Sequence, residues 1–273
     1  MHEQGPAWLP KKPEYLSEKT GTRPQELLLE VELQRISGCQ TACLYLVHAS
    51  KYEALSKRPE SVLHPEELKY FHSLSALKRK KDYLLGRYSA KRALLYLSDT
   101  RSAPTIHSAP AIHIKPGIFQ QPLVNGPGCE ELSICITHSG NLAAAVAFPT
   151  GHPLGIDLER KDRTLVETLK QHIDQEELPP TLLCASEAER YTRVWTVKES
   201  LSKILKCGLT TPFSILRLRA DPSAGGPVWS GGFENFSQYR FISLCSKELS
   251  FALVHPGRTT VVVALEKIIH FTA

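Results

Sequence analysis

A strand-like segment with two carboxylates is the first place where residue type and spacing could do chemistry. Residues 155–159 read Gly-Ile-Asp-Leu-Glu. In an extended strand Asp157 and Glu159 would point to one face, and the intervening Ile156 and Leu158 to the other. Aspartate is disfavoured in strands, and a second carboxylate beside it adds repulsion unless a cation lies between them. The segment therefore predicts a metal-binding strand, with an exposed acidic edge strand as the simpler alternative.

A helix-like segment further along the chain adds a carboxylate and lysines. Residues 195–203 read Trp-Thr-Val-Lys-Glu-Ser-Leu-Ser-Lys. Trp195, Glu199 and Lys203 are spaced four apart and would form one stripe of a helix, with Lys198 beside it. Glu199 and Lys203 could instead be a surface ion pair, which contributes only about 0.3–0.5 kcal/mol. Trp195 is expected to pack the helix against the strand and to take no part in chemistry.

Three carboxylates that converge with lysines suit a divalent cation that holds a polyphosphate. Oxygen atoms are the ligands that Mg²⁺ prefers, and ammonium groups neutralise the remaining phosphate charge. We therefore expect Asp157, Glu159 and Glu199 to bind Mg²⁺, and Lys203 and Lys198 to bind phosphate oxygens.

The first half of the chain offers basic side chains on a second helix. Residues 78–97 have a helical rhythm of apolar side chains and a basic face. We expect Lys78, Arg79 and Arg87 of that face to bind an anion, although a run of charge is more often a solvated surface.

A turn at residues 138–141 is the other candidate anion contact of the first half. Gly140 beside His138 and Ser139 would free backbone N–H groups to bind an anion. A plain surface histidine is the alternative for His138.

The elements that must position these residues are short strands and a few helices, which predicts the α+β class. Helices are expected at 65–71, 78–97, 165–173 and 186–207. Strands are expected at 27–33, 44–47, 111–114, 155–159, 213–218, 240–244, 249–255 and 259–265, with a hairpin over 132–148.

Two internal alignments indicate that the chain is duplicated. Residues 136–149 align without gaps with 243–256, and 83–91 with 195–203, at offsets of 107 and 112 residues. We therefore predict a pseudo-dimer of two similar α/β subdomains, each a long helix packed on a small antiparallel sheet, with the active site in the cleft between them.

The predicted boundaries follow from composition and from the duplication. A loosely ordered extension is expected at 1–25, rich in Pro, Lys and Glu. The N-terminal subdomain would span 26–150 and the C-terminal subdomain 151–273.

Composition and charge narrow the class of protein. The 273 residues carry a net charge of +5, a mild excess that favours an anionic ligand or acidic protein partner over nucleic acid. No apolar run approaches the ~20 residues of a membrane span, and the N-terminus does not resemble a secretory signal. The seven cysteines, at an odd number and without a C-x-x-C spacing, predict free thiols in a cytoplasmic protein. We expect a monomeric protein that binds no nucleic acid and does not associate with a membrane.

The acidic segment 155–159 followed by the segment 195–203 resembles the pair of motifs of the 4′-phosphopantetheinyl transferases in their long, internally duplicated form. Leu-Leu-Gly-Arg at 84–87 with Lys91 is similar to the family's first basic helix, and Thr137-His-Ser to the turn that touches the diphosphate. The family often carries Gly-Lys-Pro before that hairpin, whereas here Gln121 stands where the lysine is common.

The resemblance implies an enzyme that moves the phosphopantetheine arm of coenzyme A to a serine of an acyl or peptidyl carrier protein and releases adenosine 3′,5′-bisphosphate. It implies Mg²⁺ as cofactor and coenzyme A as co-substrate, with Asp157, Glu199 and Lys203 as catalytic residues. Fatty-acid, polyketide and peptide-synthase carriers all stay open as acceptors. The alternative is a catalytically silent paralogue that binds coenzyme A or a carrier protein.

Overall fold

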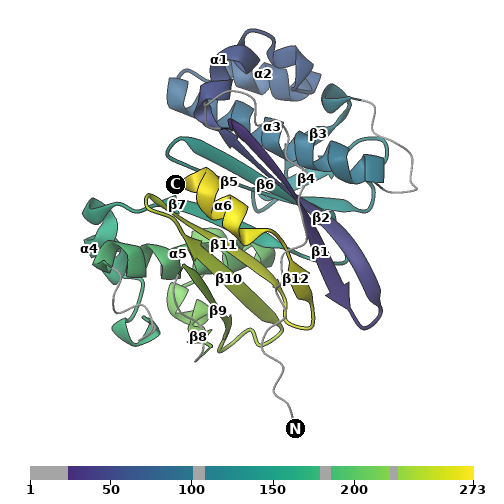
Figure 1. The fold of residues 1–273 in the computed structure, drawn as a ribbon. Coiled ribbons are helices and arrows are strands. Elements are labelled where there is room, and N and C mark those ends of the chain that lie inside the picture. Colours follow the sequence, from purple (N-terminus) through teal and green to yellow (C-terminus); the bar gives the residue numbers. More distant parts are fainter. Residues whose placement is uncertain (1–23, 101–107, 179–185, 222–226) are drawn as a thin grey trace.

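The fold consists of four layers, in the order helix, sheet, sheet, helix (Figure 1). The computed structural model describes residues 24–100, 108–178, 186–221 and 227–273. The predicted extension at 1–25 lies outside the described residues apart from 24 and 25. Mixed helices and antiparallel sheets confirm the predicted α+β class.

The first sheet is antiparallel with strand order β12-β1-β2-β6-β5, and the helix α3 covers one of its faces. Alternate residues of β2 decide which side chains meet that helix: Tyr45 and Val47 pack under α3, whereas Leu44 and Leu46 face the other sheet. The strands are β1 (Glu26–Arg35), β2 (Gly38–His48), β5 (Leu132–Ser139), β6 (Leu142–Pro149) and β12 (Thr260–Val262); the helix is α3 (Leu77–Thr100).

The second sheet repeats this plan with strand order β7-β11-β10-β9-β8 and the helix α5 on its outer face. Trp229, Phe233 and Phe241 of the sheet pack against Val194, Val197 and Leu201 of α5. The strands are β7 (Gly155–Arg160), β8 (Leu218–Ala220), β9 (Val228–Phe233), β10 (Tyr239–Cys245) and β11 (Leu249–Pro256); the helix is α5 (Glu187–Leu205).

Smaller elements complete each half. The first half adds α1 (Tyr52–Ser56), α2 (Pro65–Ser73), β3 (His113–Pro116) and β4 (Pro122–Asn125). The second adds α4 (Val166–Lys170), the 3₁₀ turns η5 (Gln175–Glu177) and η8 (Phe213–Leu216), and α6 (Leu265–Thr272).

The C-terminal segment joins the two halves. Strand β12 pairs with β1 of the first sheet, and Ile268 of α6 is buried in the apolar layer between the sheets. The boundaries 26–150 and 151–273 stay a prediction, but residues 260–262 contribute a strand to the sheet of the first half.

A buried lysine and glutamate recur at matching places in the two halves. Lys91 of α3 donates to Glu67 and to the carbonyl of Val62, and Ile114 N–H of β3 donates to the same glutamate. Glu67 also receives the backbone N–H of His64 as part of a capping box.

The second half contains the same arrangement. Lys198 of α5 donates to Glu177 (2.7 Å) and to the carbonyl of Phe213 (3.0 Å), while Leu218 N–H of β8 donates to Glu177. Glu177 forms a capping box with Asp174. Both lysines are fully buried.

This recurrence corrects the predicted register of the helices. Lys91 corresponds to Lys198 and not to Lys203, so the helices align at an offset of 107 residues. The hairpins align at the same offset, which the sequence comparison had already indicated for 136–149 and 243–256. One offset for helix and hairpin strengthens the case for a duplicated unit.

Several predicted elements differ from the structure. Residues 213–218, expected as a strand, form η8 and the start of β8, and 259–265, also expected as a strand, divide between β12 and the start of α6. The predictions did not include α1, β4, β9 or α6. Six described cysteines are free thiols, and Cys184 lies outside the described residues. Within the described ranges, no helix combines the length and apolarity that a bilayer crossing requires.

Candidate active site

Strand β7 directs its carboxylates away from the apolar layer, as its alternation predicted. Ile156 and Leu158 are fully buried between the two sheets. Asp157 and Glu159 therefore face the other side of the strand, where α5 lies.

A glycine sets how closely α5 approaches β7. A Cβ at Gly155 would lie 2.1 Å from the carbonyl oxygen of Ser200 on α5. No side chain fits at that distance, so glycine is required for this close approach of strand and helix. The contact holds Glu199, the neighbour of Ser200, next to the carboxylates of β7.

Asp157 is the centre of the candidate site. Its Oδ1 accepts hydrogen bonds from Lys203 Nζ of α5 (2.7 Å) and from Thr137 Oγ1 of β5 (2.8 Å). Lys203 Nζ also donates to the carbonyl oxygen of Ile156 (3.0 Å). The side chain of Asp157 is 5% exposed, and three elements from both halves of the chain meet on it.

The edge strands β5 and β7 are joined by three short side chains of β5 at alternate positions. Ile156 N–H donates to Cys135 Sγ, Leu158 N–H to Thr137 Oγ1 and Arg160 N–H to Ser139 Oγ. These contacts satisfy backbone groups that the edge strand β7 would otherwise leave unpaired. They also fix the carboxylates of β7 against the first half of the chain.

Glu159 and Glu199 both titrate at higher pH than ordinary glutamates. Burial, followed by the negative charge of Asp157, raises the pKa of Glu159 to about 7. The same two causes raise the pKa of Glu199. Ser139 Oγ donates to Glu159 Oε2 (3.1 Å), which favours the charged form but does not outweigh burial.

Lys203 is held in its charged form. Burial alone would lower its pKa, but the nearby carboxylates, Asp157 first, outweigh burial and raise the pKa. The cluster thus contains a firmly protonated lysine and two glutamates whose negative charges repel that of Asp157. A cation placed among these oxygens would relieve that repulsion.

The three carboxylates of Asp157, Glu159 and Glu199 are ligands that suit a divalent cation, although their side chains are not arranged in a metal-coordination geometry. Within the described residues, no group of three or more His, Cys, Asp or Glu side chains is arranged to hold a metal ion. Asp157 Oδ2 is nevertheless buried and has no hydrogen-bond partner in the described part of the chain. Buried carboxylate oxygens are rarely left without a partner, so this atom is a candidate ligand of Mg²⁺.

Lys198 is not among the residues that the structure brings to this cluster. Its ammonium group is buried against Glu177 and the carbonyl of Phe213, and burial lowers its pKa. Trp195 is a packing residue, but its ring lies against Phe213 of η8 with centroids 4.7 Å apart, and the apolar cluster that it joins contains no residue of β7, the strand it was predicted to contact.

The predicted anion contacts of the first half lie on and beside α3. Lys78 and Arg79 are exposed in its first turn. Arg87 lies over the ring of Tyr83, and its Nε is 3.3 Å from Glu67. The positive charge of Arg87 is therefore partly compensated by the negative charge of the buried Glu67.

The hairpin histidine and the loop glutamine also have partners. His138 Nδ1, on a half-exposed side chain, lies 4.0 Å from Asp82 of α3. Gln121 accepts a hydrogen bond from Phe119 N–H within its own loop (2.9 Å).

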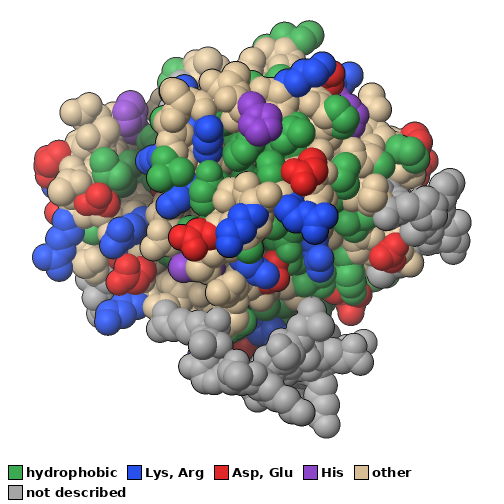
Figure 2. Space-filling model, turned by 90° about the horizontal axis from the view of Figure 1, so that it is seen from above, with side chains coloured by type: hydrophobic (Ala, Val, Ile, Leu, Met, Phe, Trp, Pro, Cys, Tyr) green, Lys and Arg blue, Asp and Glu red, His purple; other side chains and the backbone are tan. Residues whose placement is uncertain are grey.

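On the face seen from above in Figure 2, basic side chains are interspersed with acidic ones.

Sequence reasoning missed the structural role of the β5 side chains. Thr137 and Ser139 were predicted as part of a turn that touches a diphosphate, yet their hydroxyls contact the carboxylates of β7. The alternation of Cys135, Thr137 and Ser139 is a sequence signal of one polar strand face, but it does not reveal which strand that face meets.

One family model matches part of the chain. Residues 153–254 match the family model described as the 4′-phosphopantetheinyl transferase superfamily. A crystal structure of a holo-ACP synthase from Plasmodium yoelii is similar at 19% identity and a TM-score of 0.33, over 45% of this chain and 95% of that chain. Among curated proteins, none matches. The matched residues contain both motifs with their three carboxylates and Lys203.

Proposed function

We propose, from the premise that residues 153–254 belong to the 4′-phosphopantetheinyl transferase superfamily, that this protein transfers the 4′-phosphopantetheine arm of coenzyme A to a serine of an apo carrier protein. One observation carries the proposal. Asp157 lies where the two halves meet, with one oxygen bonded to Lys203 and Thr137 and the other buried without a partner in the described residues.

Asp157, Glu159 and Glu199 would hold Mg²⁺ beside the diphosphate of coenzyme A. The ion would supply positive charge to the phosphate oxygens as negative charge develops on the leaving group. Two observations support this role. Asp157 Oδ2 is a buried acceptor without a hydrogen-bond partner among the described residues. The raised pKa values of Glu159 and Glu199 show that their negative charges are not fully compensated by nearby positive charge.

The transfer forms one bond to phosphorus and breaks another. The carrier serine Oγ attacks the phosphorus nearest the pantetheine, the bond from that phosphorus to the bridging oxygen breaks, and adenosine 3′,5′-bisphosphate leaves. Glu199 would accept the serine proton, and burial, which raises its pKa, makes it a stronger base than an ordinary glutamate. Lys203 stabilises charge on the departing bisphosphate.

The remaining contacts to coenzyme A would come from the first half. Lys78, Arg79 and Arg87 of α3 would bind the 3′-phosphate and adenosine end, with His138 and Ser139 near the diphosphate. Lys198 was predicted to join them, but its bonds to Glu177 and Phe213 make a structural role the better-supported proposal. We further propose that the protein acts as a cytoplasmic monomer.

Incubation with coenzyme A, Mg²⁺ and a panel of apo carrier proteins tests the activity by intact-mass spectrometry. The proposal expects at least one carrier to gain the mass of one phosphopantetheine arm, and Asp157→Asn to abolish that gain. Binding of coenzyme A without a mass gain on any carrier would instead favour the catalytically silent paralogue.

A further inference from the structure

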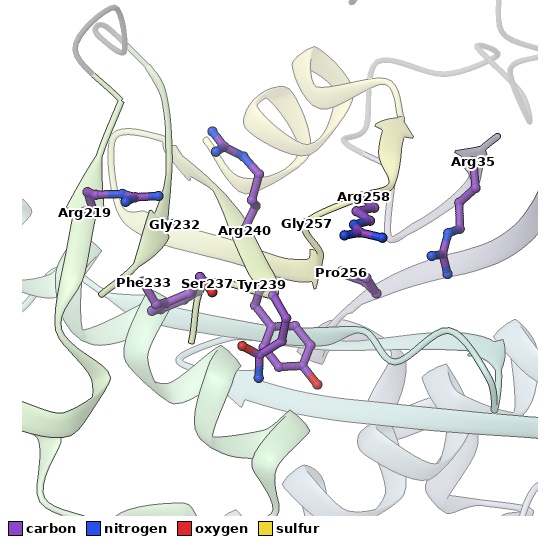
Figure 3. Close-up of a pocket in the computed structure, with 11 residues that line it drawn as sticks. Arg35, Arg219, Gly232, Phe233, Ser237, Tyr239, Arg240, Pro256, Gly257 and Arg258 are labelled. Atoms are coloured by element: carbon purple, nitrogen blue, oxygen red, sulfur yellow. The ribbon is translucent and has the colours of Figure 1, made fainter. Parts of the chain in front are cut away.

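A cavity beside strands β8, β9 and β10 of the second sheet is lined by arginines. Its volume is about 520 Å³, within the range of roughly 300–1,000 Å³ that small-molecule sites occupy. Four arginines line it, and Figure 3 shows that they come from four different segments. These are Arg35 at the end of β1, Arg219 of β8, Arg240 of β10 and Arg258 between β11 and β12.

The strand register places two of these arginines on one face of the sheet, on either side of a glycine. Arg219 and Arg240 both pair with Gly232, the residue of β9 that lies between them. Residues directly opposite in neighbouring strands share a face, and the two Cα atoms are about 10 Å apart at the usual strand spacing. Because glycine has no side chain, no side chain of β9 stands between the two arginines at this level of the sheet.

The cavity has an excess of positive charge. Arg240 forms an ion pair with Asp221, which compensates one of the four charges. Within the described residues, Arg35, Arg219 and Arg258 have no carboxylate at ion-pair distance, and no Asp or Glu lines the cavity. Like charges gathered around one cavity repel each other unless an anion binds between them.

The cavity is distinct from the candidate active site. Arg35 pairs with Gly38 at one end of β2, whereas His48 at the other end pairs with Leu142, beside the turn between β5 and β6. Strand β2 has 11 residues, so Arg35 lies about 33 Å from that turn at about 3.3 Å per residue. Arg240 lies nearer to Asp157, but it shares a face of β10 with Ile242, which packs between the two sheets, whereas Asp157 lies on the opposite face, where α5 lies.

We propose that this arginine cavity binds a small molecule through a phosphate or diphosphate group. Guanidinium groups match phosphate geometry because their planar N–H groups donate in pairs to two oxygens. The concave shape and the modest net charge of +5 favour a small ligand over a nucleic acid. The hydroxyl-bearing Ser237 and Tyr239 also line the cavity and add neutral polar groups next to the arginines.

Isothermal titration of the full-length protein with pyrophosphate, in EDTA so that no divalent cation can bind, tests the proposal. We expect Arg219→Gln/Arg258→Gln to weaken binding at least about tenfold, equivalent to about 1.4 kcal/mol. Arg35→Gln, on another element, should weaken it as well. Lys57→Gln/Arg58→Gln removes two exposed positive charges from the turn that follows α1, and should bind like wild type.

Two results would overturn the proposal. Equal affinity of wild type and Arg219→Gln/Arg258→Gln would show that pyrophosphate binds elsewhere. Citrate binding as tightly as pyrophosphate to the wild-type protein would show that the cavity responds to charge and does not select phosphate. Far-ultraviolet circular dichroism of each variant confirms that the fold is kept.

Discussion

Replacing Glu159 with glutamine should stabilise the metal-free protein at alkaline pH. The folded protein holds this carboxyl at a pKa of about 7, whereas 4.5 is the ordinary value. Between these two pH values the unfolded chain has released the proton and the folded chain has kept it. The free energy of unfolding therefore falls as pH rises through this interval, since the folded state binds more protons.

The expected size follows from the width of that interval. The range from 4.5 to about 7 covers about 2.5 pH units, and each unit corresponds to about 1.36 kcal/mol, so the full penalty is about 3 kcal/mol. Below pH 4.5 the carboxyl is protonated in both states and the penalty vanishes. Glutamine carries no charge at any of these pH values, so Glu159→Gln should lack the penalty altogether.

Urea unfolding in EDTA, followed by tryptophan fluorescence at about pH 4 and about pH 8, measures this difference. The variant should exceed wild type by up to about 3 kcal/mol at the higher pH and match it at the lower. Glu130→Gln, at an exposed glutamate, should follow the wild-type pH dependence. If wild type and Glu159→Gln lose stability in parallel across this range, the raised pKa and the argument from repulsion among the carboxylates are both wrong.

Three other changes probe the elements around the site. Gly155→Ala should push α5 away from β7, costing about 1–3 kcal/mol or more in thermal unfolding and abolishing transfer, whereas Gly151→Ala, where a Cβ meets nothing within 4 Å, should do neither. Thr137→Val should cost about 1–3 kcal/mol of unfolding free energy and weaken Mg²⁺ binding, whereas Thr137→Ser should retain both; equal behaviour of the two variants would contradict the hydroxyl's role. Lys198→Met should cost about 3–5 kcal/mol in urea unfolding, and Glu177→Gln added to it should restore stability with unchanged coenzyme A affinity; a stable double variant that no longer binds coenzyme A would contradict a structural Lys198.

The motif on β7 could be predicted from the sequence because its information is local. Alternation along an extended strand places Asp157 opposite Ile156 whatever the strand packs against. The four-residue spacing of Glu199 and Lys203 likewise places both on one stripe of α5. Such periodicities need no knowledge of tertiary contacts.

Lys198 shows where local information ends. Its position beside the stripe was compatible with phosphate binding, but the direction of its side chain depends on η5 and η8, which cover that face of α5. The alignment of Lys91 with Lys203 failed for the same reason, since only the buried glutamate partners reveal which lysines correspond.

Strand β9 was missed because its two glycines argue against a strand. A Cβ at Gly231 would lie 2.4 Å from the carbonyl of Arg219 and 2.8 Å from the ring of Phe241. The glycine is thus required by the packing of neighbouring strands, which its own sequence does not reveal. Helix α6 was missed because its isoleucines favour a strand, whereas burial between the sheets decides its conformation.

Titration calorimetry with Mg²⁺ in the presence of coenzyme A tests most directly whether the carboxylates of β7 and α5 share one ion. Wild type should bind a single Mg²⁺ per chain and release protons, since Glu159 must ionise to act as a ligand. Asp157→Asn, which keeps an acceptor for Lys203 and Thr137, should show no binding at this site. An unchanged Mg²⁺ affinity and stoichiometry in Asp157→Asn would contradict the account.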